Sequence, residues 1–178
     1  MAVLTKSGWN RAGVPLAIRP SGWGMALGCS GLLLVLVLLP PFVPEPFRSF
    51  VMLVFEPLCH QMPGRSFHVH GHQLAVCHRC LGMYAGLFAG AFLFGYVRRW
   101  DAFLMRCSGL ILVMAIAVPG IDWALGFTGL WANTTFSQTA TGAFFGITAG
   151  YYFARACART RVGDAREPVR SMFTRARS

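Results

Sequence analysis

Residues 31–39 read GLLLVLVLL, an uninterrupted apolar run at the centre of a longer apolar segment from Trp23 to Val43. A helix of about 20 such residues is long enough to cross the hydrocarbon core of a bilayer. A cleaved signal peptide is the alternative interpretation. However, the run starts late in the chain, and Pro40-Pro41 follows it in place of a small-residue cleavage site. Residues 23–43 are therefore predicted to remain as a membrane anchor.

The composition supports a membrane protein of one domain. The chain has 178 residues, of which 55% are hydrophobic and 12% charged, and a soluble domain has about 25% charged residues. The net charge of +10 would suggest nucleic acid as the partner of a soluble protein. Here the basic residues lie at the ends of apolar segments, which favours a bilayer containing anionic lipid as the partner and argues against nucleic acid.

Three further segments have the composition of spans, namely residues 81–97, 102–127 and 136–157. Pro119 is expected to kink or loosen the last turns of the third. In the second and fourth spans glycines recur at every fourth position (Gly82, Gly86, Gly90; Gly142, Gly146, Gly150). Small residues at this spacing let helix backbones approach closely in lipid, either within the chain or against another subunit of a membrane assembly. The predicted fold class is an all-α integral membrane protein with four transmembrane helices in a bundle.

The segment between the first two spans is predicted to lie at the membrane surface. Residues 47–55 are apolar but too short to span, and they follow Glu45-Pro46, a suitable helix start. We expect a short interfacial helix there. A loop rich in Cys and His follows, over residues 59–80.

The distribution of Lys and Arg predicts the orientation. If both termini are cytoplasmic, the inner segments hold most of the basic residues: Lys6, Arg11, Arg19, Arg98, Arg99 and the Arg-rich tail. The outer segments then hold only Arg48, Arg65 and Arg79, as the positive-inside rule requires. The protein is thus expected in a prokaryotic cytoplasmic membrane, with a basic N-terminus (1–22) and tail (158–178) inside and residues 59–80 on the outer face.

Residues 59–80 hold all five histidines of the chain and three of its six cysteines. Cys77 and Cys80 have the Cys-x2-Cys spacing of a metal knuckle, and Cys59 can return from the preceding segment as a third ligand. A histidine would be the fourth, with His60 and His78 favoured because each adjoins a cysteine. Thiolate and imidazole suit zinc first, with iron, haem or copper as alternatives. Asp122, Arg65 and Arg79 are candidates for supporting positions around the ligands.

The same cysteines also allow a redox site. His78 and Arg79 inside the Cys77–Cys80 pair would favour the thiolate. A Cys-x-x-Cys at the outer end of the second of four spans resembles the membrane thiol–quinone oxidoreductases, which implies a quinone cofactor. Those enzymes carry a second cysteine pair between spans three and four, and residues 126–136 of this chain contain no cysteine. A metal-ion carrier and a purely structural role for the cysteines are further alternatives.

The pattern CHQxPxRSF from Cys59 to Phe67, followed by Gly71 and by VCxRCxGxYxG from Val76 to Gly86, resembles a family of small prokaryotic membrane proteins known only as a domain of unknown function. The resemblance covers about residues 55–150. It implies a multi-span topology and no particular activity. The family pattern places an Arg three residues before Thr141-Gly142, and this chain has Gln138 there.

Overall fold

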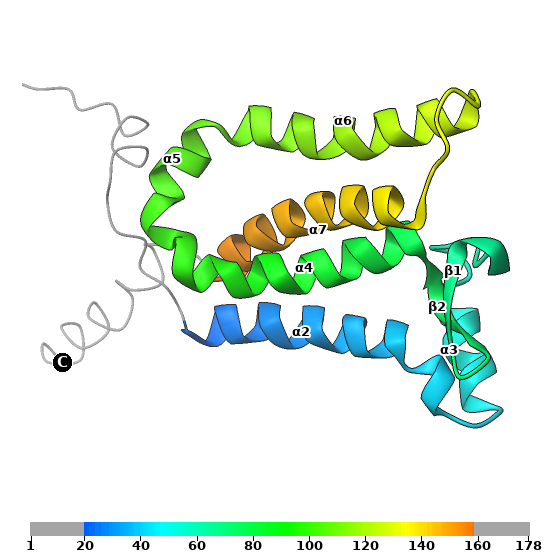
Figure 1. Ribbon diagram of the computed structural model, residues 1–178. Coiled ribbons are helices and arrows are strands. Elements are labelled where there is room, and N and C mark those ends of the chain that lie inside the picture. The colour runs from blue at the N-terminus through cyan, green and yellow to red at the C-terminus, as the bar shows by residue number, and fades with distance from the viewer. Residues whose placement is uncertain (1–19, 159–178) are drawn as a thin grey trace, which may run out of the picture.

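The computed structural model describes residues 20–158 and is built mainly from four long helices (Figure 1). These are α2 (Pro20–Leu38), α4 (His78–Val97), α6 (Ser108–Phe127) and α7 (Thr135–Ala158). The predicted cytoplasmic tail and nearly all of the predicted cytoplasmic N-terminus lie outside the described residues. The expectation of a mostly helical protein suited to a membrane is confirmed, because α2, α4 and α6 are each long and apolar enough to cross a bilayer.

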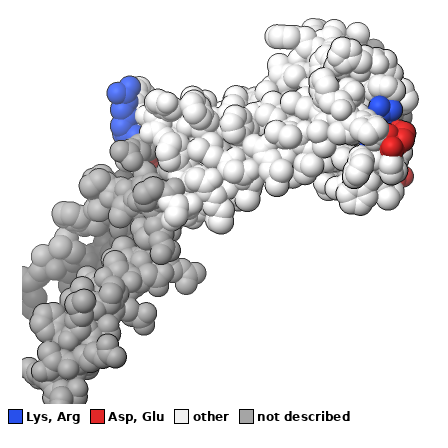
Figure 2. All heavy atoms as spheres, turned by 90° about the horizontal axis from the view of Figure 1, so that it is seen from below, with Lys and Arg blue, Asp and Glu red and all other residues white. Residues whose placement is uncertain are grey.

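The remaining elements lie at the two ends of the long helices (Figure 1). One end, here called the site end, carries η1 (Pro40–Phe42), α3 (Phe47–Phe55), η2 (Pro63–Arg65), β1 (Ser66–Val69) and β2 (His72–Cys77). The other, here called the basic end, carries η3 (Arg98–Trp100) and α5 (Asp101–Arg106). On the face that Figure 2 shows, the charged side chains lie at these two ends, and the surface of the helices between them is uncharged. This is the charge distribution that a bilayer requires, since a charged side chain in hydrocarbon is costly.

Two helix boundaries differ from the sequence-based expectation. Helix α4 begins at His78, three residues before the predicted start of the second span, so that its first turn includes Cys80. The predicted third span is divided at Cys107 into α5, which forms the corner of the chain, and α6 (Figure 1). Helix α6 continues through Pro119. The short helix expected over residues 47–55 is present with those bounds.

The all-α expectation needs a correction at the site end, where residues 66–77 form an antiparallel β-hairpin. Val69 pairs with His72 across a two-residue turn of His70 and Gly71, whose φ angles are 51° and 77°. A turn with two positive φ angles matches the right-handed twist of a hairpin, and glycine at its second position adopts such an angle without steric cost. The hairpin leads directly into α4, since β2 ends at Cys77 and the helix starts at His78.

Helices α4 and α7 run in the same direction and touch along their glycine faces. A Cβ added at Gly86 would lie 2.8 Å from the backbone nitrogen of Ile147 and 3.0 Å from the carbonyl carbon of Gly146. Gly82 and Gly90 meet α7 in the same way, one turn to either side. In lipid, where helices gain little from the hydrophobic effect, such close van der Waals contact is a main source of association.

Helix α2 packs against both α4 and α7, whereas α6 packs against α7. Near the start of α2, the indole nitrogen of Trp23 donates a hydrogen bond to the carbonyl oxygen of Ala91 at 2.9 Å. The outward faces of α2 and α6 remain apolar and exposed, with Leu32, Leu110 and Ile116 each more than half exposed. Exposed aliphatic side chains of this kind are suited to contact with lipid chains.

Replacing Gly86 or Gly146 with Leu is expected to separate α4 from α7. Overpacking a tight contact typically costs about 1–3 kcal/mol, and backbone neighbours leave little room for relief. The thermal midpoint of detergent-purified protein should therefore fall, as followed by tryptophan fluorescence. Gly28→Leu is the matched control, because an added Cβ there meets nothing within 4 Å. Equal midpoints for all three variants would contradict the packing described.

Candidate metal or thiol site

Three cysteines from separate parts of the chain meet at the site end. The Sγ atoms of Cys59, Cys77 and Cys80 all lie within 4.8 Å of one another. Cys59 is separated from the other two by the whole hairpin. The convergence predicted from their spacing is therefore present, and no histidine or carboxylate among residues 20–158 belongs to this close group.

Cys59 is placed by the end of α3. The backbone of the helix continues for one irregular turn, in which the Cys59 N–H donates to the carbonyl oxygen of Phe55 at 2.9 Å. The Cys59 side chain is buried in an apolar cluster that includes Val37, Phe55 and Val76. This cluster joins α2, α3 and β2, so the burial of apolar side chains directs the Cys59 thiol toward the hairpin.

Cys77 and Cys80 are placed by the junction between strand and helix. Cys77 is the last residue of β2, and Cys80 lies in the first turn of α4. The chain turns from strand to helix between these two residues, and both of their sulfur atoms lie within 4.8 Å of the Cys59 sulfur. The local conformation thus brings two thiols together, and the apolar cluster supplies the third.

A set of hydrogen bonds holds the segment between Cys59 and the hairpin independently of the cysteines. The Gln61 amide donates to the carbonyl oxygen of Met52 at 2.7 Å, and the Gln73 amide donates to the carbonyl oxygen of Gln61 at 2.7 Å. The Ser66 hydroxyl accepts from Gln73 at 3.2 Å and donates to the carbonyl oxygen of Met62 at 3.0 Å. Residues 61–66 are therefore tied to both α3 and β2.

The Cys59 sulfur is surrounded by hydrogen-bond donors. The thiols of Cys77 and Cys80 hold the pKa of Cys59 far below its ordinary value, against the opposing effect of burial. The backbone N–H of Cys77 also donates to this sulfur, at 3.2 Å. Donors around a sulfur stabilise negative charge on it, and the thiolate is the form that binds metals and attacks disulfides.

The geometry of the three sulfurs fits a single metal ion. Zinc binds thiolate at about 2.3 Å, so two sulfurs on one tetrahedral ion lie about 3.8 Å apart. Separations below 4.8 Å need only small side-chain adjustments to reach that value. A cluster of soft sulfur atoms in apolar surroundings suits zinc or copper(I) better than a hard cation such as magnesium.

The histidines of the segment do not join the three sulfur atoms in one close group. His60 is exposed beside Cys59, and His68 and His70 are exposed on the hairpin. His78 is buried, with its ring centroid 4.4 Å from that of Phe67. The structure thus gathers the three predicted sulfur ligands, while the predicted ligand roles of His60 and His78 stay predictions.

Arg79, in the first turn of α4, forms an ion pair with Asp122 of α6, and both side chains are largely buried. Two of the residues predicted to support the site are thus partners of each other. The pair ties the site end of α6 to the helix that carries Cys80. Arg65 lies exposed in η2 and forms no ion pair within residues 20–158.

Sequence reasoning missed the supporting polar residues Gln61, Ser66 and Gln73. Uncharged polar side chains next to predicted ligands were the available signal, but their partners are mostly backbone carbonyls that no sequence pattern specifies. It also missed the hairpin, for which Gly71 between alternating residues was the signal.

The fold and the cysteine cluster together define a helical membrane protein with a three-thiol site at one end. By comparison with known families, the chain belongs to the DUF2085 family, described as predicted membrane proteins, which matches residues 59–152. The matched range starts at Cys59 and contains all three cysteines.

Two archaeal relatives are similar to this chain, and both are named only as uncharacterized proteins. One, from Methanocaldococcus jannaschii, is 32% identical over 99 residues, which are 56% of this chain and 63% of the relative. The other, from Methanothermobacter thermautotrophicus, is 32% identical over 79 residues, which are 43% of this chain and 69% of the relative. No solved structure matches the chain.

Removing one member of the Arg79–Asp122 pair is expected to leave a buried charge without its partner. Arg79→Met or Asp122→Leu should each destabilise the protein by on the order of 3 kcal/mol, and the double variant by less than the sum. Thermal unfolding in detergent measures this cycle. Glu45→Gln is the control, because its carboxylate is exposed and solvent weakens its pair with Arg48. Strict additivity of the two single variants would show that the pair is not coupled.

Proposed function

We propose that this protein is a membrane-embedded metal-site protein in which Cys59, Cys77 and Cys80 bind one soft metal ion, zinc being the first candidate. The convergence of three sulfurs within 4.8 Å is the observation that carries the proposal. Cys59 is buried, hydrogen bonds hold the segment that follows it, and the Cys77 N–H donates to its sulfur. These features favour a thiolate at the site. Its role would be structural or accessory, within a larger membrane assembly or in the chain itself.

A tetrahedral ion needs a fourth ligand besides the three sulfurs. His60 follows Cys59 directly and is exposed, so its side chain is free to reorient among rotamers. His78 lies in the same first turn of α4 as Cys80 but is buried against Phe67. We favour His60 as the fourth ligand because its side chain is exposed and free to reorient. His78 and a water molecule are the other choices. A histidine would close the site, as in structural zinc sites, whereas water would leave it open for chemistry.

We further propose four spans with the cysteine site on the outer face. Helix α7 lies along α4 in the same direction, so a bilayer that contains α4 also contains α7. The basic end carries Arg98, Arg99 and Arg106, and the positive-inside rule places such an end in the cytoplasm. Both termini are then cytoplasmic, and the thiols face an oxidising compartment in which metal binding would protect them from oxidation.

A thiol–disulfide oxidoreductase coupled to a quinone is the second candidate. The observation that favours it is the proximity of the Cys77 and Cys80 sulfur atoms, which lie within 4.8 Å of each other at the junction of β2 and α4. Oxidation of this pair to a disulfide would release two electrons and two protons to a quinone, with Cys59 able to attack the resulting disulfide. The connection between α6 and α7 contains no cysteine to pass electrons onward, so we rank this function second.

Metal analysis of detergent-purified protein is expected to give about one equivalent of zinc per chain. Cys59→Ser, Cys77→Ser and Cys80→Ser should each lose most of it, because two sulfurs alone bind zinc weakly. Cys29→Ser and Cys107→Ser are the matched controls, since neither residue belongs to the cluster. Elemental analysis by mass spectrometry provides the measurement.

The same sample distinguishes the two candidates. Thiol alkylation before and after reduction detects a reducible Cys77–Cys80 disulfide. If the protein contains this disulfide and no metal, the redox function is favoured over the metal site. Visible absorption in the purified protein would indicate iron, haem or copper(II) in place of zinc. His60→Ala tests the fourth ligand, and zinc binding at wild-type affinity in that variant would exclude it.

A further inference from the structure

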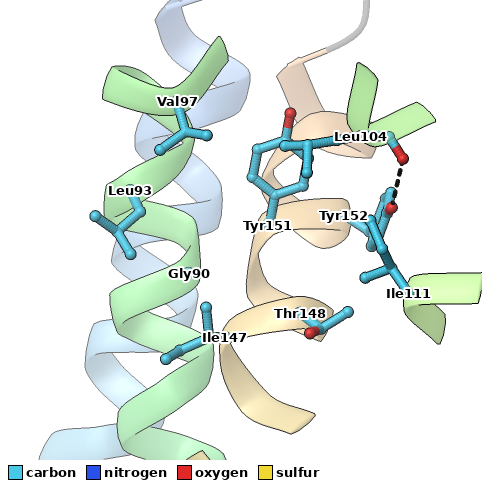
Figure 3. Close-up of a pocket in the computed structure, with 9 residues that line it drawn as sticks. All are labelled: Gly90, Leu93, Val97, Leu104, Ile111, Ile147, Thr148, Tyr151 and Tyr152. Atoms are coloured by element: carbon cyan, nitrogen blue, oxygen red, sulfur yellow. Dashed lines mark hydrogen bonds between the residues drawn. The ribbon is translucent and has the colours of Figure 1, made fainter. Parts of the chain in front are cut away.

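A pocket of about 190 Å³ lies toward the basic end of the bundle, away from the cysteine site (Figure 3). Its walls come from four helices, with Leu93 and Val97 on α4, Leu104 on α5, Ile111 on α6 and Ile147 on α7. Leu93 is 40% exposed, so the pocket is reached from the lipid-facing surface of the molecule. Helix α6 makes its main contacts with α7, and the pocket lies between these helices, α4 and α5.

Hydrogen bonds to α5 fix the shape of this pocket. Tyr152 donates to the carbonyl oxygen of Leu104 at 3.2 Å, the bond drawn in Figure 3. Asp101, at the start of α5, accepts from the hydroxyl of Tyr151 at 2.9 Å and from Nε of Arg155 at 2.6 Å. Three side chains of α7 thus bind α5 through hydrogen bonds. These bonds fix the part of the pocket wall that α5 contributes.

The polar groups of the pocket's lining side chains are already used within the protein. The hydroxyls of Tyr151 and Tyr152 bond to α5, and the hydroxyl of Thr148 donates to the carbonyl oxygen of Phe144 at 3.1 Å. The pocket therefore presents aromatic rings and aliphatic groups to an occupant. An apolar chain fits such a surface, whereas a quinone ring would bring carbonyl groups that find no free donor among these side chains.

Two arginines lie close in the sequence to residues that line the pocket. Val97 and Leu104 line the pocket, and Arg99 and Arg106, two residues further along each segment, are exposed. Neither arginine forms an ion pair within residues 20–158, and the carboxylate of Asp101 is neutralised by Arg155. Figure 2 shows basic atoms exposed at this end. An apolar pocket beside unpaired arginines matches the two parts of an anionic phospholipid.

We propose that this pocket and the two arginines form a binding site for one anionic phospholipid, with an acyl chain in the pocket and the phosphate against Arg99 and Arg106. A dry apolar cavity of about 150 Å³ is enough to bind benzene, so the observed volume holds a chain segment of several methylene groups. Trp100 follows Arg99 directly and is more than half exposed, so it would lie at headgroup depth.

Native mass spectrometry of the delipidated full-length protein tests the site, with phosphatidylglycerol and phosphatidylcholine of identical acyl chains as probes. One phosphatidylglycerol per chain should bind about tenfold or more tightly than phosphatidylcholine. Because each arginine near a headgroup contributes to the attraction, the double variant R99Q/R106Q should weaken phosphatidylglycerol binding by about 10- to 30-fold. Arg65→Gln, an exposed arginine at the site end, is the control and should bind as wild type.

The pocket itself is tested by Ile111→Trp, which fills it, against Leu110→Trp, which adds the same ring on an exposed position next to it. The first should lose about tenfold in phosphatidylglycerol affinity and the second should not. Equal binding of the two lipids, unchanged binding in Ile111→Trp, or a quinone that occupies the pocket in competition with the lipid would each overturn the proposal. Competition by millimolar glycerol 3-phosphate alone would also overturn it, because it would mean that the headgroup binds without the pocket.

Discussion

The close contact between α4 and α7 is the interaction on which the rest of this structure depends. Glycines on both helices bring the two backbones together along most of their length, at distances that leave no room for a Cβ atom. A contact of this kind fixes both separation and register, since van der Waals attraction falls off within about an ångström of its optimum. The first turn of α4 and the last turns of α7 are consequently held in fixed relation, and each carries the polar side chains of one end of the molecule.

Helix α6 is less closely packed and is secured mainly at its two ends. At the site end Arg79 pairs with Asp122, and at the basic end Asp101 of the preceding α5 pairs with Arg155 of α7. Both pairs join charges that would be costly to leave alone near hydrocarbon. Between them α6 makes its main contacts with α7, and the apolar pocket lies between these helices, α4 and α5. The same arrangement therefore explains how α6 is held in place and why a cavity lies beside it.

The cysteine site is formed by the fold before any ion or disulfide is considered. Cys59 is held by the apolar cluster under α3, and Cys77 and Cys80 are held by the passage from β2 into α4. Gln61 and Gln73 connect these two parts through backbone carbonyls. Such preorganisation reduces the conformational entropy that ligand side chains lose on binding, and it keeps three thiols close enough to share one ion or to exchange a disulfide.

Composition and local spacing were enough to predict the membrane class, the approximate positions of the apolar helices, the short helix over residues 47–55 and the grouping of the three cysteines. Only the tertiary structure decided that residues 66–77 form a hairpin, that Asp122 is the partner of Arg79 and that the helices leave a pocket near Arg99 and Arg106. Side-chain pairings between helices depend on rotation and register, which local sequence leaves open. The contact of α4 with α7 sets both, because it permits only a narrow range of approach.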